Sequence, residues 1–282
     1  MRSKDKVLAF LIEQGEEPIS GERIAEQIGI SRNAVWKAIE ALRNEGCEIE
    51  AAPRRGYRLR GSADALTPAG IAARAGDASL AGKIHVYGEI PSTSTLAKEM
   101  ALHGAPHGTT VIADSQRRGS GRREKTFYSP PGGVYMSVVL RPEAFPHTER
   151  ETVTACAAVS TLEAILAVTG LLPEIKPVND LFLRGKKICG ILTESVSDLE
   201  SGEPEWIVTG IGINVCFFED SLPEELRGIA GAIYEGDTCP PVRAALAGEV
   251  LKGILMTSPA RSREEILAIY REHIGAAFLR TT

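Results

Sequence analysis

The sequence predicts an α+β protein with a small helical domain followed by a larger domain of mixed β-sheet flanked by helices. Three observations predict this. The chain has 282 residues, about twice the size of a typical domain. Short amphipathic helices fill residues 1–60, whereas strand-like runs rich in Val and Ile cluster between residues 84 and 213. Helical segments surround that cluster, which favours a sheet with helices on one face.

Composition excludes fibrous and disordered proteins, because 43% of the residues are hydrophobic and 24% are charged. No apolar run approaches the roughly 18 residues that cross a bilayer, and residues 7–12 are too short for a signal-peptide core. We therefore expect a cytoplasmic protein that does not contact a membrane. The five cysteines are widely spaced and odd in number, which predicts reduced, mostly buried thiols.

The first predicted domain, residues 1–60, contains three helices. One is expected over about residues 3–14, a second between a Ser20 cap and Gly29, and a third after Ser31. Apolar residues recur at helical spacing in each. A helix, a turn at Gly29 and a further helix, over residues 21–40, is the arrangement of a helix-turn-helix.

The helix-turn-helix predicts DNA binding. Arg32, Asn33 and Lys37 project from the first turns of the third helix, where side chains reach base edges in a major groove. Two strand-like runs after Gly46 predict a wing. Its tip residues Arg54 and Arg55 would contact phosphates.

The role of Trp36, the charge of residues 1–60 and an alternative function for this domain also follow from the sequence. Trp36 is predicted to pack in the domain rather than to read bases. Residues 1–60 contain 11 Lys and Arg against 10 Asp and Glu, so DNA affinity would depend on local basic clusters. The alternative function is a three-helix packing module with a solvated charged face.

Residues 61–66 form the predicted linker, and residues 67–280 form the second domain. Thr67 followed by Pro68 is typical of a helix start. Further helices are expected at 95–102, 150–169, 242–256 and 262–277. Strands are expected at 84–87, 109–113, 134–140, 175–178, 188–192 and 206–213.

Residues 116–125 form a predicted loop rich in Gly and Arg between two strands. Glycine lets a backbone approach a ligand closely, and guanidinium groups match phosphate oxygens. The spacing fits neither a phosphate-binding loop of nucleotide hydrolases nor a dinucleotide fingerprint. Either a nucleotide-binding loop or a solvated surface loop is consistent with this segment alone.

Several segments together are more specific. They occur in the order and spacing of biotin protein ligases: residues 92–94, 116–125, 127–132, 176–180, 186–194 and 210–214. With its N-terminal helix-turn-helix, the chain resembles the family of bifunctional biotin operon repressors and biotin protein ligases. The resemblance runs to about Tyr270. It implies a catalytic domain of the class II aminoacyl-tRNA synthetase and biotin ligase type.

The resemblance implies a reaction between biotin and ATP, with Mg²⁺, that forms biotinyl-5′-AMP and then biotinylates a lysine. That lysine belongs to the biotin carboxyl carrier protein of acetyl-CoA carboxylase or another biotin-dependent carboxylase. Arg122 and Lys187 match catalytic positions. The implied biotin contacts are Ser92, Thr93, Ser94, Gln116, Ser120, Gly121, Arg122 and Lys187. The implied ATP contacts are Asn179, Asp180 and Asn214, with Asp180 also a candidate magnesium ligand.

The resemblance also implies regulation. Biotinyl-5′-AMP would act as co-repressor, ordering loops of the central domain so that a homodimer forms and binds a palindromic operator of biotin genes. Family members carry a further small β-rich domain of about 50 residues at the C-terminus. The present sequence ends where its first strand would begin, so we expect that domain to be missing.

The sequence departs from the family's pattern at three places. Ser120 replaces an arginine of the loop, Glu124-Lys125 replaces Gly-Arg, and Pro177 replaces a tryptophan. Loss of one guanidinium predicts weaker retention of the adenylate, by about 1.5–3 kcal/mol. Because Pro177 cannot donate a backbone hydrogen bond, packing around biotin is expected to differ. The alternative function is therefore a biotin-sensing repressor with impaired or lost ligase activity.

Overall fold

The computed structural model describes residues 3–14, 17–44, 49–52, 55–59, 64–122, 125–197, 204–216, 222–236 and 239–279. The chain divides into two compact units. The first contains Met1–Gly82 and Pro241–Gly248, and the second contains Lys83–Pro240 and Glu249–Thr282. The predicted 61–66 linker lies partly outside the described residues, and its position stays a prediction.

The three predicted helices of the first unit are confirmed as α1 (Ser3–Gln14), α2 (Gly21–Ile28) and α3 (Arg32–Asn44). The Ser20 hydroxyl accepts a hydrogen bond from the Arg23 backbone N–H at 3.2 Å, and Ser31 caps α3 in the same way. Gly29 ends α2 in the left-handed conformation that glycine adopts without strain. Local sequence thus determines where these helices begin and end.

The helices of this unit share one apolar core. Its fully buried side chains include Val7, Leu11, Ile24, Val35, Ile39 and Leu42. The predicted packing role of Trp36 is wrong, because 53% of this residue is exposed. The reason is helical periodicity: Val35 and Ile39 occupy the inward face of α3, and Trp36 lies on the outward face.

The predicted wing is confirmed as an antiparallel hairpin of β1 (Ile49–Ala52) and β2 (Gly56–Leu59). Two backbone hydrogen bonds of 2.8 Å join Tyr57 to Ile19, which attaches the hairpin to the segment before α2. Gly56 has φ of 107°, and a Cβ there would collide with the Ile19 carbonyl. Only glycine fits this junction.

Two further elements belong to the first unit. The predicted helix after Thr67 is confirmed as α4 (Pro68–Arg74), and its residue Ala69 joins the core of the helical domain. The first turn of α7 (Arg243–Lys252) is held by Asp64, which accepts hydrogen bonds from the Arg243 backbone N–H at 2.8 Å and from Nε at 2.6 Å. The compact unit therefore extends beyond the helix-turn-helix and its wing.

The described part of the second unit contains an eight-stranded mixed sheet. Seven strands follow the order β3-β4-β6-β10-β9-β8-β7, and β5 pairs with β4. Among the described strand pairs of this sheet, only β3 and β4 are parallel. The strands are β3 (Ile84–Ile90), β4 (Thr110–Ser120), β5 (Thr126–Ser129), β6 (Val134–Leu140), β7 (Glu174–Lys176), β8 (Asp180–Leu183), β9 (Lys186–Ser197) and β10 (Pro204–Ile213).

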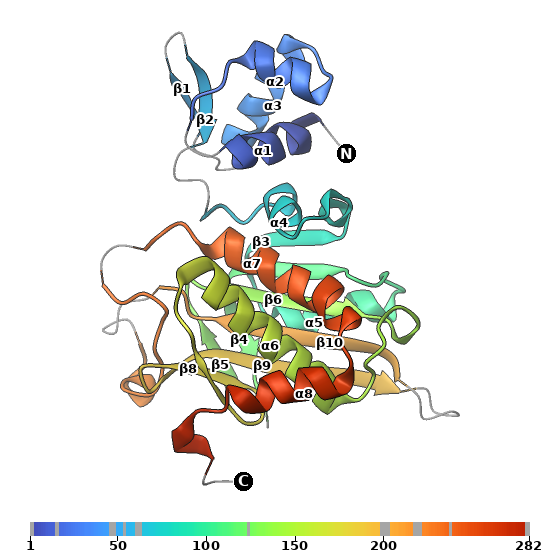
Figure 1. Ribbon diagram of the computed structural model, residues 1–282, viewed down its shortest axis with the longest axis vertical. Coiled ribbons are helices and arrows are strands. Elements are labelled where there is room, and N and C mark those ends of the chain that lie inside the picture. Colours follow the sequence, from blue (N-terminus) through green and yellow to red (C-terminus); the bar gives the residue numbers. More distant parts are fainter. Residues whose placement is uncertain are drawn as a thin grey trace. The chain divides into compact units, whose positions relative to one another are not determined.

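Helices cover both faces of this sheet, so the prediction of one covered face is wrong. On one face Ser94 of α5 (Thr93–Leu102) lies 3.1 Å from Ser137 of β6, hydroxyl to hydroxyl. On the other face Thr154 of α6 (Arg150–Thr169) donates to Thr193 of β9 at 2.9 Å. Figure 1 shows α8 (Arg263–Glu272) beside α6. Buried hydroxyls on opposite strand faces thus hold helices on both sides.

The mixed sheet and flanking helices are as predicted, but its strands are longer and more numerous. Residues 116–120 of the predicted loop belong to β4, because β5 pairs with them. The short strands β5 and β8 were not predicted. Predicted helix 242–256 is α7 followed by a π-helical turn, Gly253–Thr257.

The prediction that no apolar segment is long enough to cross a bilayer is wrong for helix α6. By length and composition it is apolar enough to cross a membrane, with a mean hydropathy of 1.6 over an 18-residue window. However, 72% of that window is buried within the protein. Burial of this extent is typical of a core helix, which is the role that α6 has beneath the sheet.

We predict that Gly56→Ala destabilises the first unit by about 2–4 kcal/mol, because the new Cβ meets the Ile19 carbonyl and positive φ disfavours alanine. Hydrogen exchange of the α1 and α3 amides measures the effect. Gly29→Ala is the matched control: it also has positive φ, but nothing lies within 4 Å of its Cβ. Equal protection in the two variants would contradict the steric argument.

Candidate functional site

A cavity of about 650 Å³ opens on the sheet of the second unit. This volume lies in the usual range for small-molecule sites. Its lining includes all the predicted catalytic, biotin-side and ATP-side residues except Ser92: Thr93, Ser94, Gln116, Ser120, Gly121, Arg122, Asn179, Asp180, Lys187 and Asn214. Residues from segments up to about 120 positions apart therefore meet in one cavity.

Glycines form the floor of the cavity. Along one face of β10, Trp206 and Val208 pack in the core beneath α5, and Gly210 and Gly212 follow at the same period of two. Gly212 lies opposite Gly190 of β9 in the sheet register. The same strand face thus changes from large apolar side chains to bare backbone, which leaves space above the sheet.

The ring of Phe127 lies on this glycine floor. A Cβ at Gly190 would lie 2.9 Å from the ring, and one at Gly212 would lie closer still. The ammonium of Lys187 lies 5.8 Å from the ring centroid, within the range of a cation–π contact. Phe127 was not among the predicted site residues, since its role depends on two glycines far away in sequence.

Hydroxyl and amide groups gather at the end of the cavity near α5. Gln116 Oε1 accepts hydrogen bonds from the Thr93 backbone N–H at 2.7 Å and from its hydroxyl at 3.1 Å. Ser137 donates to Thr93 at 2.8 Å. Gln116 Nε2 donates to Ser129 at 2.9 Å. This network fixes polar donors and acceptors at the edge of an apolar floor.

Ser92 has a supporting position instead of lining the cavity. It caps α5 by accepting from the Thr95 backbone N–H, and its hydroxyl lies 3.0 Å from that of Ser120. The residue that replaces the family's arginine thus joins the end of β4 to the cap of α5. Arg123 and Glu124 of the same loop lie outside the described residues.

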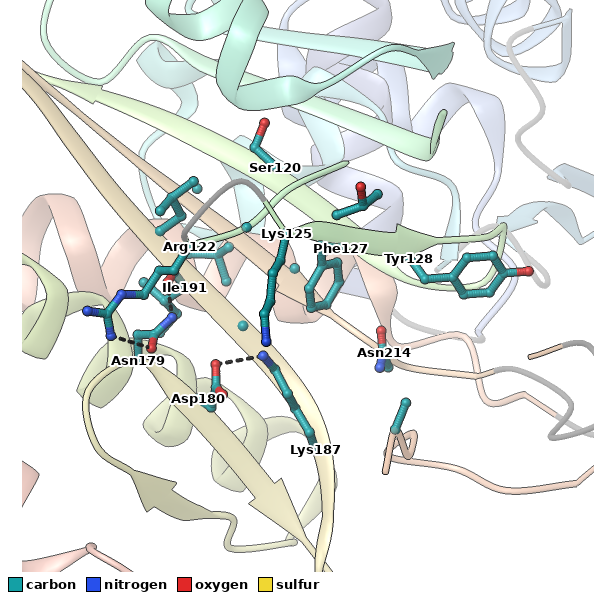
Figure 2. Close-up of a pocket in the computed structure, with 18 of the residues that line it drawn as sticks. Ser120, Arg122, Lys125, Phe127, Tyr128, Asn179, Asp180, Lys187, Ile191 and Asn214 are labelled. Carbon is teal, nitrogen blue, oxygen red and sulfur yellow. Dashed lines mark hydrogen bonds and ion pairs between the residues drawn. The ribbon is translucent and has the colours of Figure 1, made fainter. Parts of the chain in front are cut away.

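Cationic groups gather at the opposite end (Figure 2). The Lys187 ammonium lies 2.7 Å from Asp180 Oδ1, and Arg122 donates to Asn179 Oδ1 at 3.3 Å. Figure 2 shows the side chain of Lys125 directed toward the Lys187–Asp180 pair. Lys125 was not among the predicted site residues, although it lies in the motif.

The charges of the cavity favour an anion. Among its described lining residues are the cations Arg122, Lys125, Lys176 and Lys187, against the carboxylates Asp180 and Glu225. An excess of positive charge in a concave site concentrates field lines and attracts anionic ligands. The cavity therefore has a neutral polar end and a cationic end, joined by an apolar floor.

Tyr270 of α8 holds the turn that carries Asn179 and Asp180. Its hydroxyl donates to the Val178 carbonyl at 2.9 Å. Burial, with a smaller effect of the Asp180 carboxylate, raises the pKa of Tyr270 to about 12, so it remains a donor at neutral pH. Pro177 lies in this turn just beyond the end of β7, where a missing N–H costs no ladder hydrogen bond.

Asn214 follows β10 at the rim of the floor and is 5% exposed. Its Nδ2 donates to the Gly231 carbonyl at 3.0 Å, whereas Oδ1 is buried without a hydrogen-bond partner. A buried acceptor without a partner costs free energy unless a ligand supplies a donor. Asn214 is thus prepared to accept a hydrogen bond from a bound molecule.

Residues 222–230 form a further wall that the sequence pattern did not indicate. Leu222, Glu225, Leu226, Ile229 and Ala230 line the cavity, and backbone hydrogen bonds join Lys187 to Ile229 at 2.9 Å and Gly231 to Lys187 at 2.8 Å. No periodic run or motif marks this segment. Its role follows only from its pairing with β9.

A disulfide joins Cys216, which precedes this wall in the sequence, to Cys239, which follows it. Their Cα atoms lie 5.9 Å apart. The prediction that the cysteines are reduced is therefore wrong for this pair, which the chain brings together from 23 positions apart. Cys156 and Cys189 are free and buried. Burial raises the pKa of both thiols, that of Cys156 to about 12, so neither is a reactive thiolate. Cys47 lies outside the described residues.

A magnesium ion fits this cavity only together with a phosphorylated ligand. Among the described residues, no group of three His, Cys, Asp or Glu side chains is placed to hold a metal. Asp180 Oδ1 is ion-paired with the Lys187 ammonium at 2.7 Å, so this carboxylate would bind a metal only by sharing or giving up that ion pair. Magnesium commonly binds one or two carboxylates plus substrate phosphates.

The first unit presents a separate polar surface. Arg32, Asn33 and Lys37 are exposed on α3, as the sequence predicts. Arg55 is exposed at the turn of the wing, whereas Arg54 lies outside the described residues. A neighbouring wing arginine, Arg58, is ion-paired with Glu50 at 2.8 Å. The helix and the wing thus both carry exposed cations.

Comparisons with known proteins give one family match to the helix-turn-helix region and one to the region that contains the cavity. Residues 4–58 match the model of the HTH domain, and residues 87–214 match that of the biotin/lipoate A/B protein ligase family. The fold and the cavity, with these matches, define a protein of the ligase class that carries a helix-turn-helix domain.

The chain is 38% identical to the bifunctional ligase/repressor BirA of Bacillus spizizenii over 256 residues, covering 89% of this chain and 77% of that protein. It is 30% identical to BirA of Escherichia coli over 70% of this chain and 59% of that protein. The chain belongs to the family of bifunctional ligase/repressor BirA proteins. Its structure is similar to the biotin protein ligase of Aquifex aeolicus in complex with biotin and ATP, with TM-score 0.56, 27% identity, and coverage of 68% of this chain and 78% of that one.

We predict that the Cys216–Cys239 crosslink stabilises the second unit. Reduction of the native protein should lower its free energy of unfolding in urea by about 3 kcal/mol, because the crosslink restricts the unfolded chain. Cys239→Ser should start at the lower value and not respond to reductant. If non-reducing peptide mapping finds both thiols free in air-equilibrated protein, the prediction is wrong.

Proposed function

We propose that this protein is an ATP-dependent biotin protein ligase that also represses transcription of biotin genes. It would form biotinyl-5′-AMP, transfer biotin to a lysine of a biotin carboxyl carrier protein, and use the adenylate as co-repressor. The observation that carries this proposal is the two-ended cavity. A neutral hydrogen-bonding end and a cationic end, separated by an apolar floor, match the ureido group, the ring system and the activated carboxyl of biotin.

Biotin would bind with its ureido group toward α5. Its carbonyl and N–H groups need neutral donors and acceptors, which Thr93, Ser94 and Gln116 supply in one network. Ser120 and the backbone of Gly121 would contact the valeryl chain, with Ser92 supporting Ser120. The apolar rings would rest on the glycine floor, where Phe127 now lies, so binding requires that ring to move.

In the first step a carboxylate oxygen of biotin would attack the α-phosphorus of ATP, and the bond to pyrophosphate would break. Two anions must approach each other, so positive charge near both lowers the barrier. Arg122 and Lys187 would supply that charge as catalytic residues. Lys125 lies where it can add a third cation, which offsets the missing arginine at position 120 and favours an active ligase over a sensor without activity.

The ATP side would be held by Asn179, Asp180 and Asn214. The partnerless Oδ1 of Asn214 would accept a hydrogen bond from the adenine amino group. Asp180 would be one ligand of a magnesium ion that binds together with the phosphates. That ion would further neutralise the phosphate charge. In the second step the carrier lysine would attack the acyl carbon, and AMP would leave.

The first unit would bind the operator. Arg32, Asn33 and Lys37 would face the major groove, and Arg54 and Arg55 would contact phosphates from the wing. A palindromic operator requires a homodimer. Within the described residues β9 pairs with β8 only as far as Gly190, so its residues 192–196 keep an open edge, which supports pairing with a second copy. We propose a cytoplasmic location without membrane contact.

We predict that Arg122→Ala lowers adenylate formation by about 100-fold or more, the cost of removing one transition-state charge contact. The assay follows labelled biotin onto a carrier domain in the presence of Mg-ATP. Arg118→Ala is the matched control, since this exposed arginine of β4 is not among the cavity residues. No labelled carrier with the unaltered protein, despite measurable biotin binding, would instead support the sensor.

A second prediction concerns the wing. Arg54→Ala combined with Arg55→Ala should weaken operator binding and reduce the slope of log affinity against log salt by about 2, because two phosphate contacts are lost. Fluorescence anisotropy at several salt concentrations measures the slope. Ligase activity of the same variant serves as the control and should not change. An unaltered salt slope would rule out phosphate contacts at the wing.

A further inference from the structure

Trp36 stands out among the described side chains of the first unit, because it is the large apolar residue there that is exposed. Its exposed fraction is 53%, whereas the chain's other tryptophan, Trp206, is 2% exposed. Tryptophan is highly buried on average in folded proteins. Tryptophan is also enriched at interfaces, which makes this exposed indole a candidate contact with another molecule.

The position of Trp36 on α3 shows what surrounds it. Successive helix residues are rotated by about 100° around the axis. Trp36 therefore lies one turn beyond Arg32 and Asn33, and it projects in a direction between theirs. Lys37 is exposed beside it. The buried residues Val35, Ala38, Ile39 and Leu42 face the core instead. The indole is therefore part of the outward face that carries the proposed DNA contacts.

The ring and cation–π contacts of the described residues do not account for this placement. Among the described side chains no aromatic or cationic group contacts the indole ring. Arg32 and Lys37 flank it with positive charge, which favours a polyanion over an apolar protein surface. A ligand with an anionic backbone and small apolar groups at its edges fits this face, and duplex DNA has both.

We propose that Trp36 reads operator sequence by contacting the C5-methyl group of a thymine in the major groove. The inference rests on the DNA-binding function proposed above. The thymine methyl is the apolar group that base pairs present in that groove, and apolar side chains recognise it by packing. Arg32 and Asn33 have polar groups suited to neighbouring base edges. The indole adds an apolar contact that polar side chains do not supply.

The test removes the methyl group alone. The protein, with biotin, ATP and Mg²⁺, first selects its operator from a duplex library of random sequence. Each thymine of the selected duplex is then replaced in turn by uracil. At one position in each half-site, we expect the unaltered protein to bind about five- to tenfold more weakly, the usual effect of one base contact.

Two variants attribute that effect to the indole. Trp36→Ala should bind the thymine and uracil duplexes equally, whereas Trp36→Phe, which keeps an aromatic face, should retain discrimination. Leu102→Ala is the matched control, because Leu102 is an exposed apolar residue of the second unit with 67% exposure. It should discriminate as the unaltered protein does.

Intrinsic fluorescence gives an independent measurement. Since Trp206 is buried, emission that iodide quenches comes from Trp36, and operator binding should remove that quenching. Discrimination by Trp36→Ala, or quenching that persists in the complex, would overturn the role of Trp36 while leaving operator binding intact. Failure of the unaltered protein to select any duplex would overturn the DNA-binding function and this inference with it.

Discussion

The cavity depends on the absence of side chains at three positions of two paired strands. Gly210 and Gly212 continue the strand face that Trp206 and Val208 begin, and Gly190 lies opposite Gly212. Any Cβ at these positions would enter space that Ser94 or Phe127 occupies. Because the side chains of a strand alternate with period two, one short run of β10 determines both where the core ends and where the cavity begins.

The rest of the site is arranged around this floor. The hydroxyl network near α5 is neutral and rigid, since every described member has a partner within the fold. The cationic end is more exposed and belongs to loops and strand ends, where side chains rearrange at little cost. In the proposed reaction the rigid end would recognise biotin, and the adaptable end would follow the phosphates as charge moves during adenylation.

In the first unit, the core and the proposed DNA contacts lie on opposite sides of α3. The core residues of this unit occupy one side of each helix, so side chains on the opposite side of α3 are not constrained by core packing. Arg32, Asn33, Lys37 and Trp36 share that free side. The wing is attached by the Ile19–Tyr57 pairing to the segment that precedes α2. Stability and the proposed recognition of DNA are thus assigned to separate faces.

The sequence by itself determined the helices of the first unit, the positions of the main strands along the chain, and all the predicted biotin-side and ATP-side residues of the cavity except Ser92. Caps, periodicity and motifs are local, and a short segment specifies them. Only the tertiary structure decided that β5 extends the pairing of β4, that helices cover both faces, and that Cys216 meets Cys239. It also decided that residues 222–230 form a wall. These features depend on contacts between distant segments, whose free energy exists only once the chain has folded.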